Sequence, residues 1–504
     1  ALPFHTGDPR LCARIGAAIG KTTQYRSRRG AFALPQASKP CRSGGGQGAR
    51  NSEYYDRPLG ASRLCLRPTA PTILQTTWEA LTLAPRDNSS LTRRSFIQKA
   101  GVAAAAVGAL GSYSKAWAQG NETLRAGLIG CGGRGTGAAN DFLNAAEDVQ
   151  VVAVADLFPD NAQNARDQLQ DDRGQTISDD MVFTGFDCYQ QICQTDVDVI
   201  LTASPPHFRP AEFAAAVATG KHIFMEKPLA VDPVGARDIM ATARLADEKG
   251  LCVAVGTQRR HQQSYQECFA RVQDGAIGEI VAARAYWNGG PLGGWDRTDA
   301  PTSVEEQIRN RWVHFAWLSG DHIVEQHVHN LDVITWFMNS HPVSAVGMGF
   351  RARKTYGDSY DFFSVDFTFE NGVHLESKCR QQPDTASNVS EWLVGTLGTA
   401  NCWGELRTHS GQDIWRFRGD QPNPYVQEHT DLVNAVRSGQ PFNDAHGVAE
   451  SVMTAVMGRE SAYSGQEITW NQVMESSLRL GPTDYYLPMD VPVSDVPLPG
   501  IYRM

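Results

Sequence analysis

The stretch that decides the fold is Leu124-Arg125-Ala126-Gly127-Leu128-Ile129, which runs directly into Gly130-Cys131-Gly132-Gly133-Arg134-Gly135. Its first six residues have the length and apolar character of a buried strand. A helix-like segment, 136–146, follows the glycines, and a β-branched segment, 149–156, follows that helix. Strand, glycine-rich turn, helix and second strand in this order predict a unit that binds a dinucleotide.

Each glycine of the turn has a physical task. Gly130 makes the tight turn, Gly132 lets the backbone approach a pyrophosphate, and Gly135 lets the helix approach the strand. The free N–H groups at the helix N-terminus, near Gly133 and Arg134, then face the phosphates. We therefore predict that all five residues bind the cofactor.

An acid, Asp156, ends the second strand about twenty residues beyond the turn, which is the spacing of the dinucleotide motif. A carboxylate at this place accepts hydrogen bonds from the adenosine ribose and disfavours a 2′-phosphate. The acid therefore favours NAD(H) as the cofactor, with NADP(H) as the alternative.

The α/β pattern continues with strand-like segments at 197–203 and 221–225 and a helix at 210–219. We expect residues 120–248 to form a Rossmann domain with a doubly wound parallel sheet. Ligands of such sheets bind at the carboxyl ends of the strands. The residues that follow these strand ends, and that we predict to contact the cofactor, are Ser204, Pro205, His207, Glu226 and Lys227.

The pattern changes in the second half of the chain. Segments 360–370, 373–380, 391–396 and 400–406 alternate between apolar and polar residues, as strands of an antiparallel sheet do. We expect residues 249–485 to form an α+β substrate domain, whose helices at 429–438 and 445–464 return to the first domain. Residues 486–504, rich in proline, are expected to form an extended C-terminal arm.

These elements resemble the glucose–fructose oxidoreductase / inositol dehydrogenase / MocA-like (Gfo/Idh/MocA) family of sugar and cyclitol oxidoreductases over roughly residues 122–470. The matching segments are the glycine turn, Ala155-Asp156, Pro205-Pro206, Glu226-Lys227-Pro228, 256–260 and 325–332. The resemblance implies an open, mostly antiparallel sheet in the second domain, whose exposed face makes homodimers or homotetramers.

The resemblance also implies the catalytic residues: Lys227 contacts the nicotinamide ribose and the substrate hydroxyl, and His329 is the acid/base. Oxidising an alcohol needs a base and a positive charge near the developing alkoxide, which these side chains supply. Glu325 and His329 are four residues apart, so we expect them to share one face of a single helix. The family's commonest residue at the first of these positions is Asp. The role of Glu325, orienting His329 or holding a substrate hydroxyl, is open.

Four further residues are assigned to the substrate site. Arg259 and Arg260 follow a strand at 251–255, with a solvated arginine pair as the alternative. Trp295 lies in a glycine-rich aromatic stretch and is predicted to stack on a sugar ring, with core filling as the alternative. Asp332 supports His329, or else is structural.

A metal site formed by Glu325 with His322, His327 and His329 is an alternative, because imidazole and carboxylate groups bind zinc. On a helix, however, His327 and His329 would point about 200° apart. The ten cysteines form no CxxC pair, which argues against a disulfide framework or a structural zinc. We therefore predict no metal.

The formal net charge of the 504 residues is −9, and the segment before residue 120 is basic. The rest of the chain is therefore more acidic than the whole and repels phosphate backbones. This excludes nucleic acid as the expected partner.

The basic N-terminal part has two segments. Residues 1–90 are rich in Arg, Ser, Gly and Pro. We expect this segment to be disordered, or to be an extension that results from a misplaced translation start. Residues 91–119 resemble a twin-arginine export signal, with Thr92-Arg93-Arg94-Ser95-Phe96-Ile97 before an apolar run too short to span a membrane. We expect an exported, periplasmic enzyme that begins near Gln119 and carries a tightly bound cofactor.

Three functions fit these observations. The first is hydride transfer between NAD(H) and a secondary hydroxyl of a sugar, cyclitol or polyol. The second is NAD-dependent glycoside cleavage by transient oxidation, and the third is non-catalytic binding of a sugar or nucleotide. Lys227 and His329 argue against the third.

Overall fold

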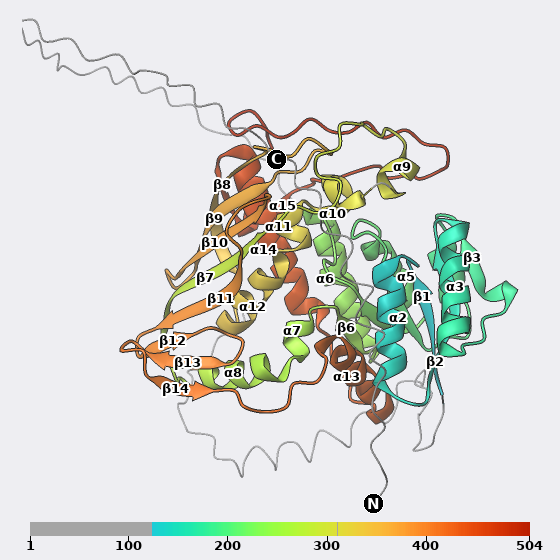
Figure 1. The fold of residues 1–504 in the computed structure, drawn as a ribbon, viewed down its shortest axis with the longest axis horizontal. Coiled ribbons are helices and arrows are strands. Elements are labelled where there is room, and N and C mark those ends of the chain that lie inside the picture. The colour runs from blue at the N-terminus through green and yellow to red at the C-terminus, as the bar shows by residue number, and fades with distance from the viewer. Residues whose placement is uncertain (1–122, 310) are drawn as a thin grey trace, which may run out of the picture. The chain divides into compact units, whose positions relative to one another are not determined.

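Strand β1 (Leu124–Ile129) lies inside a parallel sheet, with nearly all of its side chains buried. Within residues 123–309 and 311–504, which the computed structural model describes, this sheet has six strands in the order β3-β2-β1-β4-β5-β6 (Figure 1). The other strands are β2 (Val149–Asp156), β3 (Val182–Thr184), β4 (Val199–Thr202), β5 (His222–Met225) and β6 (Val253–Val255). Their order and parallel pairing confirm the predicted doubly wound sheet.

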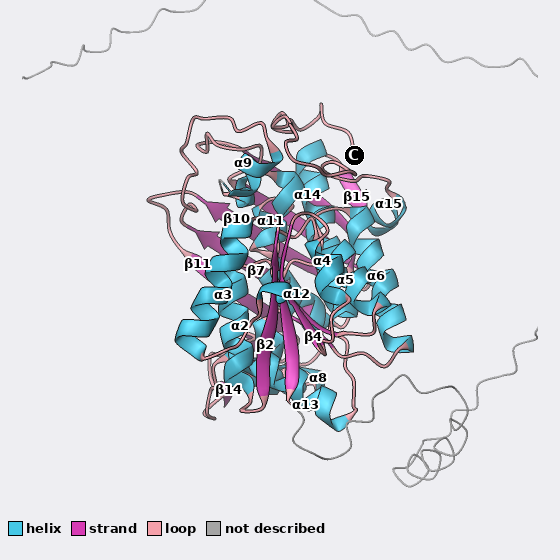
Figure 2. Cartoon of the chain, turned by 90° about the vertical axis from the view of Figure 1, so that its right-hand side faces the viewer, coloured by secondary structure: helices cyan, strands magenta, loops and turns pink. Residues whose placement is uncertain are grey.

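Helices cover both faces of this sheet, which is why its strands are apolar throughout. Figure 2 shows the strands edge-on, with α2 and α3 to one side and α4, α5 and α6 to the other. These helices are α2 (Gly133–Ala145), α3 (Pro159–Arg173), α4 (Cys188–Cys193), α5 (Arg209–Ala218) and α6 (Pro233–Glu248). A later helix, α13 (Pro424–Ser438), joins the α2 face, where Leu432 and Val433 share a core with Ala139 and Phe142.

The boundary predicted at residue 248 is too early. Strand β6 pairs with β5 and completes the first sheet, so the first domain continues at least to Val255. The helix predicted to return to the first domain does so as α13, although it lies within the range assigned to the second domain.

The second sheet has nine strands among the described residues, in the order β14-β13-β12-β11-β7-β10-β9-β8-β15. Its strands are β7 (Ile280–Gly289), β8 (Pro342–Phe350), β9 (Phe362–Phe369), β10 (His374–Gln381), β11 (Asn388–Gly395), β12 (Gly398–Ala400), β13 (Glu405–Thr408), β14 (Asp413–Arg416) and β15 (Glu467–Thr469). All neighbours are antiparallel except β7 and β10, which are parallel. The sheet is therefore open and mostly antiparallel, as predicted.

The segment 400–406, predicted as one strand, is two. Strand β12 ends at Ala400, and β13 begins at Glu405 and pairs antiparallel with it. The backbone reverses between them because Cys402 and Gly404 both have positive φ, 61° and 135°. Such conformations end a strand, and the residue alternation alone did not reveal them.

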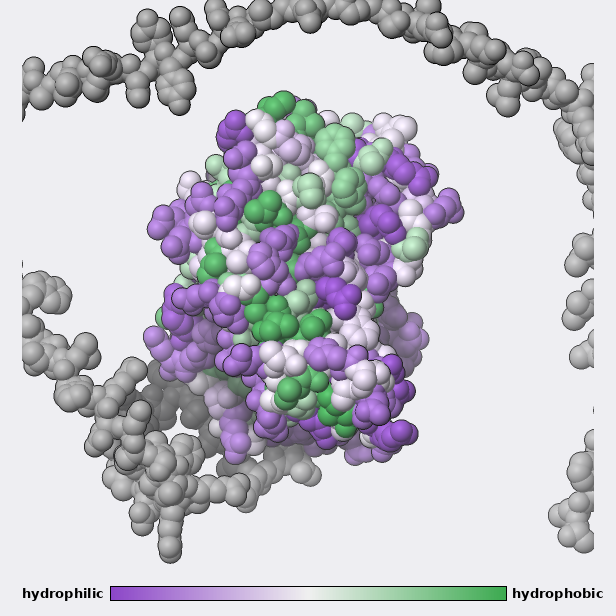
Figure 3. All heavy atoms as spheres, turned by 90° about the vertical axis from the view of Figure 1, so that its left-hand side faces the viewer, coloured by the Kyte–Doolittle hydropathy of each residue, from purple (hydrophilic) through white to green (hydrophobic). Residues whose placement is uncertain are grey.

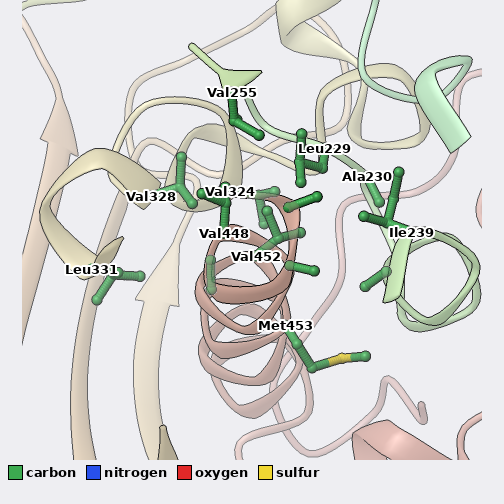
Figure 4. Close-up of a cluster of buried hydrophobic side chains, with 14 of the residues drawn as sticks. Leu229, Ala230, Ile239, Val255, Val324, Val328, Leu331, Val448, Val452 and Met453 are labelled. Atoms are coloured by element: carbon green, nitrogen blue, oxygen red, sulfur yellow. The ribbon is translucent and has the colours of Figure 1, made fainter. Parts of the chain in front are cut away.

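Helices cover one face of the second sheet and join it to the first domain. They include α7 (Gln258–His261), α8 (Gln263–Gln273), α11 (His322–Glu325), α12 (Val328–Met338) and α14 (Ala445–Ser464). Nearly every residue of α14 is buried, because the helix lies between the two domains. Figure 4 shows Val448, Val452 and Met453 of α14 beside side chains of both domains, so the domains share one core.

The chain after α15 (Trp470–Glu475) runs to its end with no further helix or strand in the described residues. We call residues 476–504 the C-terminal arm, which begins earlier than the predicted residue 486. Leu480 N donates to Asp232 in the first domain (2.8 Å), and Tyr360 of the second domain donates to Pro497 O (2.7 Å). The arm therefore contacts both domains.

The predictions for residues 1–90 and for the signal segment 91–119 lie outside the described residues. The seven cysteines of the described part are all buried and unpaired, as expected of thiols that pack as small apolar groups. None of the helices described is long and apolar enough to cross a membrane.

Candidate functional site

The glycine turn has the shape that a dinucleotide requires. Gly130 has φ +84°, and a Cβ there would lie 2.4 Å from Ser204 N. A Cβ on Gly135 would lie 1.8 Å from Gly130 O, so only glycine allows α2 this close to β1. At Gly132 and Gly133 an added Cβ would meet nothing within 4 Å. The open space before the N-terminus of α2 suits a pyrophosphate, which takes hydrogen bonds from free N–H groups.

Asp156 ties the end of β2 to the glycine turn. One carboxylate oxygen accepts from Cys131 N (2.7 Å), and the other accepts from Phe158 N (2.9 Å) and Asn161 Nδ2 (3.2 Å). Burial raises the pKa of this carboxyl, against the hydrogen bonds that lower it. Asp156 therefore shapes the turn, and its contact with the adenosine ribose stays a prediction.

Two other predicted cofactor residues contact each other. Arg134 Nε lies 3.0 Å from Glu226 Oε1, and Arg134 Nη2 lies 2.6 Å from Asp141 Oδ2. Burial raises the pKa of the Glu226 carboxyl, which Arg134 and Arg209 oppose. This pairing joins the N-terminus of α2 to the loop that carries Lys227.

Lys227 reaches across to the second domain. Its Nζ donates to the side chain of Glu325 (2.9 Å) and to Glu325 O (2.7 Å), and both side chains are mostly buried. The structure therefore brings together two of the predicted catalytic residues, and Glu325 orients Lys227.

Glu325 and His329 do not share one helix, which corrects the prediction. Helix α11 ends at Glu325, a turn occupies residues 326–327, and α12 begins at Val328. Glu325 binds Lys227, and His329 stacks on Trp287 with a centroid distance of 5.8 Å. The break allows the two side chains to take separate partners.

The imidazole of His329 is buried, and its Nδ1 has no hydrogen-bond partner among the described residues. Burial lowers its pKa well below the ordinary value, and the nearby cations Lys227 and Arg259 lower it further. His329 is therefore neutral at pH 7 and can accept a proton. A neutral base beside a fixed ammonium is the arrangement that alcohol oxidation requires.

Arg259 lies behind this group. Its Cζ is 5.8 Å from the centroid of Trp287, and its Nη1 binds Glu391 (2.6 Å). Sequence reasoning missed Glu391. A signal was available: it is an acid directly before the apolar run Trp392-Leu393-Val394.

Arg260 and Asp332, both assigned to the substrate site, bind each other. Arg260 donates two hydrogen bonds to Asp332 (2.8 and 2.9 Å), and Ser451 Oγ donates a third (2.8 Å). Both side chains are mostly buried, so the pair joins α7, α12 and α14. A contact with substrate stays a prediction for these two residues.

The other predicted residues contact side chains other than those of Lys227, Glu325 and His329. Trp295 lies in the loop after β7, where Arg353 Cζ is 5.8 Å from its ring centroid. Ser204 donates to the buried Glu212 (2.7 Å), and Pro205 begins the turn that precedes α5. His207 lies among the rings of Phe208, Trp317 and Tyr485, and burial lowers its pKa to about 4.

The residues of the metal alternative have separate partners. His327 Nε2 contacts Ser377 Oγ (2.8 Å), and His322 Nδ1 contacts Asp321 Oδ1 (3.1 Å). In the described part of the chain no three His, Cys, Asp or Glu side chains are grouped to hold a metal ion.

Two family models match the chain. One, described as an oxidoreductase family with an NAD-binding Rossmann fold, matches residues 124–257, and a GFO/IDH/MocA C-terminal domain matches residues 265–401. Together they cover more than half of the 504 residues.

Curated relatives are enzymes of this kind. An inositol 2-dehydrogenase of Acidothermus cellulolyticus is 26% identical over 310 residues, which are 61% of this chain and 79% of the relative. An inositol 2-dehydrogenase of Gluconacetobacter diazotrophicus is 25% identical over 329 residues, 63% of this chain and 88% of the relative.

Solved structures share the fold. A scyllo-inositol dehydrogenase from Lactobacillus casei with bound NAD(H) and scyllo-inositol has a TM-score of 0.54 and 19% identity, covering 69% of this chain and 100% of that one. A levoglucosan dehydrogenase in complex with NADH and levoglucosan has a TM-score of 0.57 and 17% identity, covering 70% and 100%.

Proposed function

The chain belongs to the GFO/IDH/MocA family of NAD-binding oxidoreductases, and on this premise we propose that it transfers a hydride between NAD(H) and a secondary hydroxyl of a cyclitol, sugar or related polyol. The observation that carries the proposal is the group of Lys227, Glu325 and the neutral His329. Lys227 directly follows the end of β5 and Glu226, which Arg134 joins to the dinucleotide turn. The named inositol dehydrogenases support a cyclitol or polyol as the substrate class.

Each side chain has one task in this reaction. Bound NAD⁺ supplies the hydride acceptor. His329 removes the hydroxyl proton through Nε2, because Nδ1 is enclosed. The Lys227 ammonium stabilises the developing alkoxide, and Glu325 holds that ammonium in place. In the reverse direction His329 returns the proton.

The test is a substrate panel assayed with the purified enzyme and NAD⁺. The panel contains myo-inositol, scyllo-inositol, levoglucosan, free hexoses and aryl glycosides, with NADH and released aglycone measured in parallel. We expect NADH from a cyclitol or sugar, and Lys227→Ala and His329→Ala should each abolish it while NAD⁺ still binds. Aglycone release without net NADH would identify glycoside cleavage by transient oxidation instead, and near-normal rates in either variant would contradict the site.

We also propose that the outer face of the second sheet joins copies of this chain. On β8, Val346, Met348 and Phe350 point away from α14 and are 54%, 70% and 41% exposed. Figure 3 views this side and shows apolar side chains in groups among hydrophilic ones. Exposed apolar groups of this kind favour association.

Export by the twin-arginine pathway is a further proposal, supported by the motif Thr92–Ile97. The variant with both Arg93→Lys and Arg94→Lys should keep the protein in the cytoplasm when the full chain is expressed in a bacterium with this pathway. Lys99→Arg is the control and should be exported normally. Cell fractionation with an immunoblot measures the outcome, and periplasmic protein in the double variant would contradict the proposal.

A further inference from the structure

A segment of the second domain crosses to the far end of the dinucleotide site. It comprises residues 301–309 and 311–317, which we call the cap, and it includes α9 (Val304–Arg309) and the 3₁₀ turn Trp312–His314. Figure 1 shows α9 and the dark red C-terminal arm close together at one edge of the molecule. The cap and the arm therefore lie beside each other, and neither contributes a strand to the two sheets.

The end of α9, in the middle of the cap, contacts the residues that follow β2. Arg309 donates to both carboxylate oxygens of Asp160, at 2.9 and 3.0 Å, and its Cζ lies 3.7 Å from the centroid of Phe158. Phe158 and Asp160 come directly after Asp156, where the adenosine ribose is expected. Arg309 thus joins the second domain to the adenosine end of the site.

The C-terminal end of the cap, at Trp317, contacts the residues that follow β4. The ring of Trp317 lies 5.1 Å from that of His207 and 6.5 Å from that of Phe208. Strands β2 and β4 flank β1, which carries the glycine turn. The cap is therefore attached on both sides of the strand that binds the dinucleotide.

The C-terminal arm supports the cap. Val304 N donates to Met489 O (2.9 Å), and the fully buried amide of Gln307 donates to Val491 O and accepts from Trp317 Nε1 (2.7 Å). The hydroxyl of Tyr485 contacts His207 Nε2. These hydrogen bonds satisfy the buried polar groups between the cap and the arm and hold the two segments together.

We propose that the cap and the C-terminal arm close over the adenosine half of bound NAD(H), and that Arg309 is the latch that must release Asp160 and Phe158 before the dinucleotide leaves. The latch is reversible because its ion pair is partly exposed: the side chains of Arg309 and Asp160 are 35% and 58% accessible. The buried contacts around Gln307 hold the cap itself in place. The proposal rests on the NAD(H) site of the proposed function and on no particular polyol.

The test measures NADH release from the holoenzyme. Wild type, Arg309→Gln, Asp160→Asn and the double variant are loaded with NADH and mixed with excess NAD⁺, and the loss of bound-NADH fluorescence gives the dissociation rate. Arg309→Gln should release NADH about five to ten times faster, because it loses both the partly exposed ion pair and the cation–π contact with Phe158. Asp160→Asn should accelerate release less, because it loses only the ion pair. The double variant should be no faster than Arg309→Gln, because Asp160→Asn removes only a contact that Arg309→Gln has already broken.

The matched control is Arg125→Gln, which breaks an exposed ion pair with Asp196 (2.8 Å) at the end of β1 opposite the glycine turn; the two arginines have similar exposure. It should leave the release rate unchanged. A wild-type release rate in Arg309→Gln, or an equal acceleration in Arg125→Gln, would overturn the proposal.

Hydrogen exchange is a second measurement. We expect NADH to slow exchange of the amides of 304–309, and to slow it less in Arg309→Gln. Identical exchange with and without NADH would show that the cap does not close. Neither measurement uses a polyol, so failure of the latch is distinguishable from failure of the proposed reaction.

Discussion

The imidazole of His329 is neutral because burial lowers its pKa and because Lys227 and Arg259 oppose a further positive charge. The same Lys227 is held by Glu325, so the base and the cation lie near each other without sharing a proton. At the residue scale, the proposed reaction depends on this separation of a proton acceptor from a fixed ammonium.

The first prediction concerns pH. A lowered histidine pKa keeps the base form present as pH falls through 6.5, the ordinary histidine value. The acid limb of kcat/KM for alcohol oxidation should therefore lie below pH 6.5. A pH–rate profile of the wild type measures the acid limb. A limb at or above pH 6.5 would mean that His329 of the free enzyme is charged near neutrality, against the lowered pKa.

The second prediction compares two glycines of the turn. Gly135→Ala places a Cβ against Gly130 O, so α2 must move. This overpacking should lower the free energy of unfolding by about 1–3 kcal/mol and the thermal midpoint by several degrees. Gly132→Ala points into open space and should leave the thermal midpoint of the cofactor-free protein unchanged while weakening NAD⁺ binding at least about tenfold. Calorimetry and NAD⁺ titration separate the two effects. Equal thermal midpoints of the two variants would contradict the roles assigned to these glycines.

At the element scale, short pieces of helix carry the site. Helices α11 and α12 are separated by a turn of two residues, and this break sends Glu325 to Lys227 and His329 to Trp287. The four-residue spacing predicted one face of one helix, because spacing alone cannot reveal a break that tertiary contacts stabilise. The helix α7 is as short as α11, and side-chain contacts hold it in place.

The third prediction concerns His261 of α7. Its Nδ1 lies 2.7 Å from Asp431 of α13, and its Nε2 lies 3.2 Å from Asp444, which precedes α14. Burial lowers its pKa, but the two carboxylates offset this and raise it to about 10. The charged imidazole therefore joins three helices at pH 7.

The raised pKa of His261 means that protonating the imidazole stabilises the folded state. This contribution to the free energy of unfolding is fully present below the unfolded pKa of 6.5 and is lost as pH rises toward 10. His261→Gln should thus be less stable than wild type by about 1–3 kcal/mol at pH 6. The difference should shrink steadily up to pH 10. Urea unfolding at several pH values measures it, and a difference independent of pH would show that His261 is uncharged.

At the scale of the whole molecule, α14 is the element around which both domains assemble. It contributes Val448, Val452 and Met453 to a core that also contains Leu229 of the first domain and Leu331 of the second (Figure 4). The two sheets are therefore fixed to each other, and Lys227 meets Glu325 across a rigid junction.

The fourth prediction tests the outer face of the second sheet. The wild type should be a dimer or tetramer by light scattering, and Val346→Glu with Met348→Glu should weaken its association at least about tenfold, because charges replace exposed apolar contacts. Leu245→Glu, on α6 and 50% exposed, is the control and should change nothing. A monomeric wild type would contradict an interface on this face.

The sequence by itself determined the parallel sheet and the glycine turn, whereas the assignment of Lys227 and His329 to catalysis stays a prediction. Local patterns suffice for these, because buried strands must be apolar and Gly130 and Gly135 have no room for a side chain. It also determined the open second sheet, although the reversal at Cys402 and Gly404 was hidden by a regular alternation.

Only the tertiary structure decided which partners the charged side chains take. Arg260 and Asp332 neutralise each other, Arg134 binds Glu226, and Arg309 reaches Asp160 in the other domain. These contacts join residues far apart in the chain, and their energies depend on burial and geometry rather than on sequence spacing. For the same physical reason, the neutral state of His329 and the contacts of the cap with both domains followed only from the folded structure.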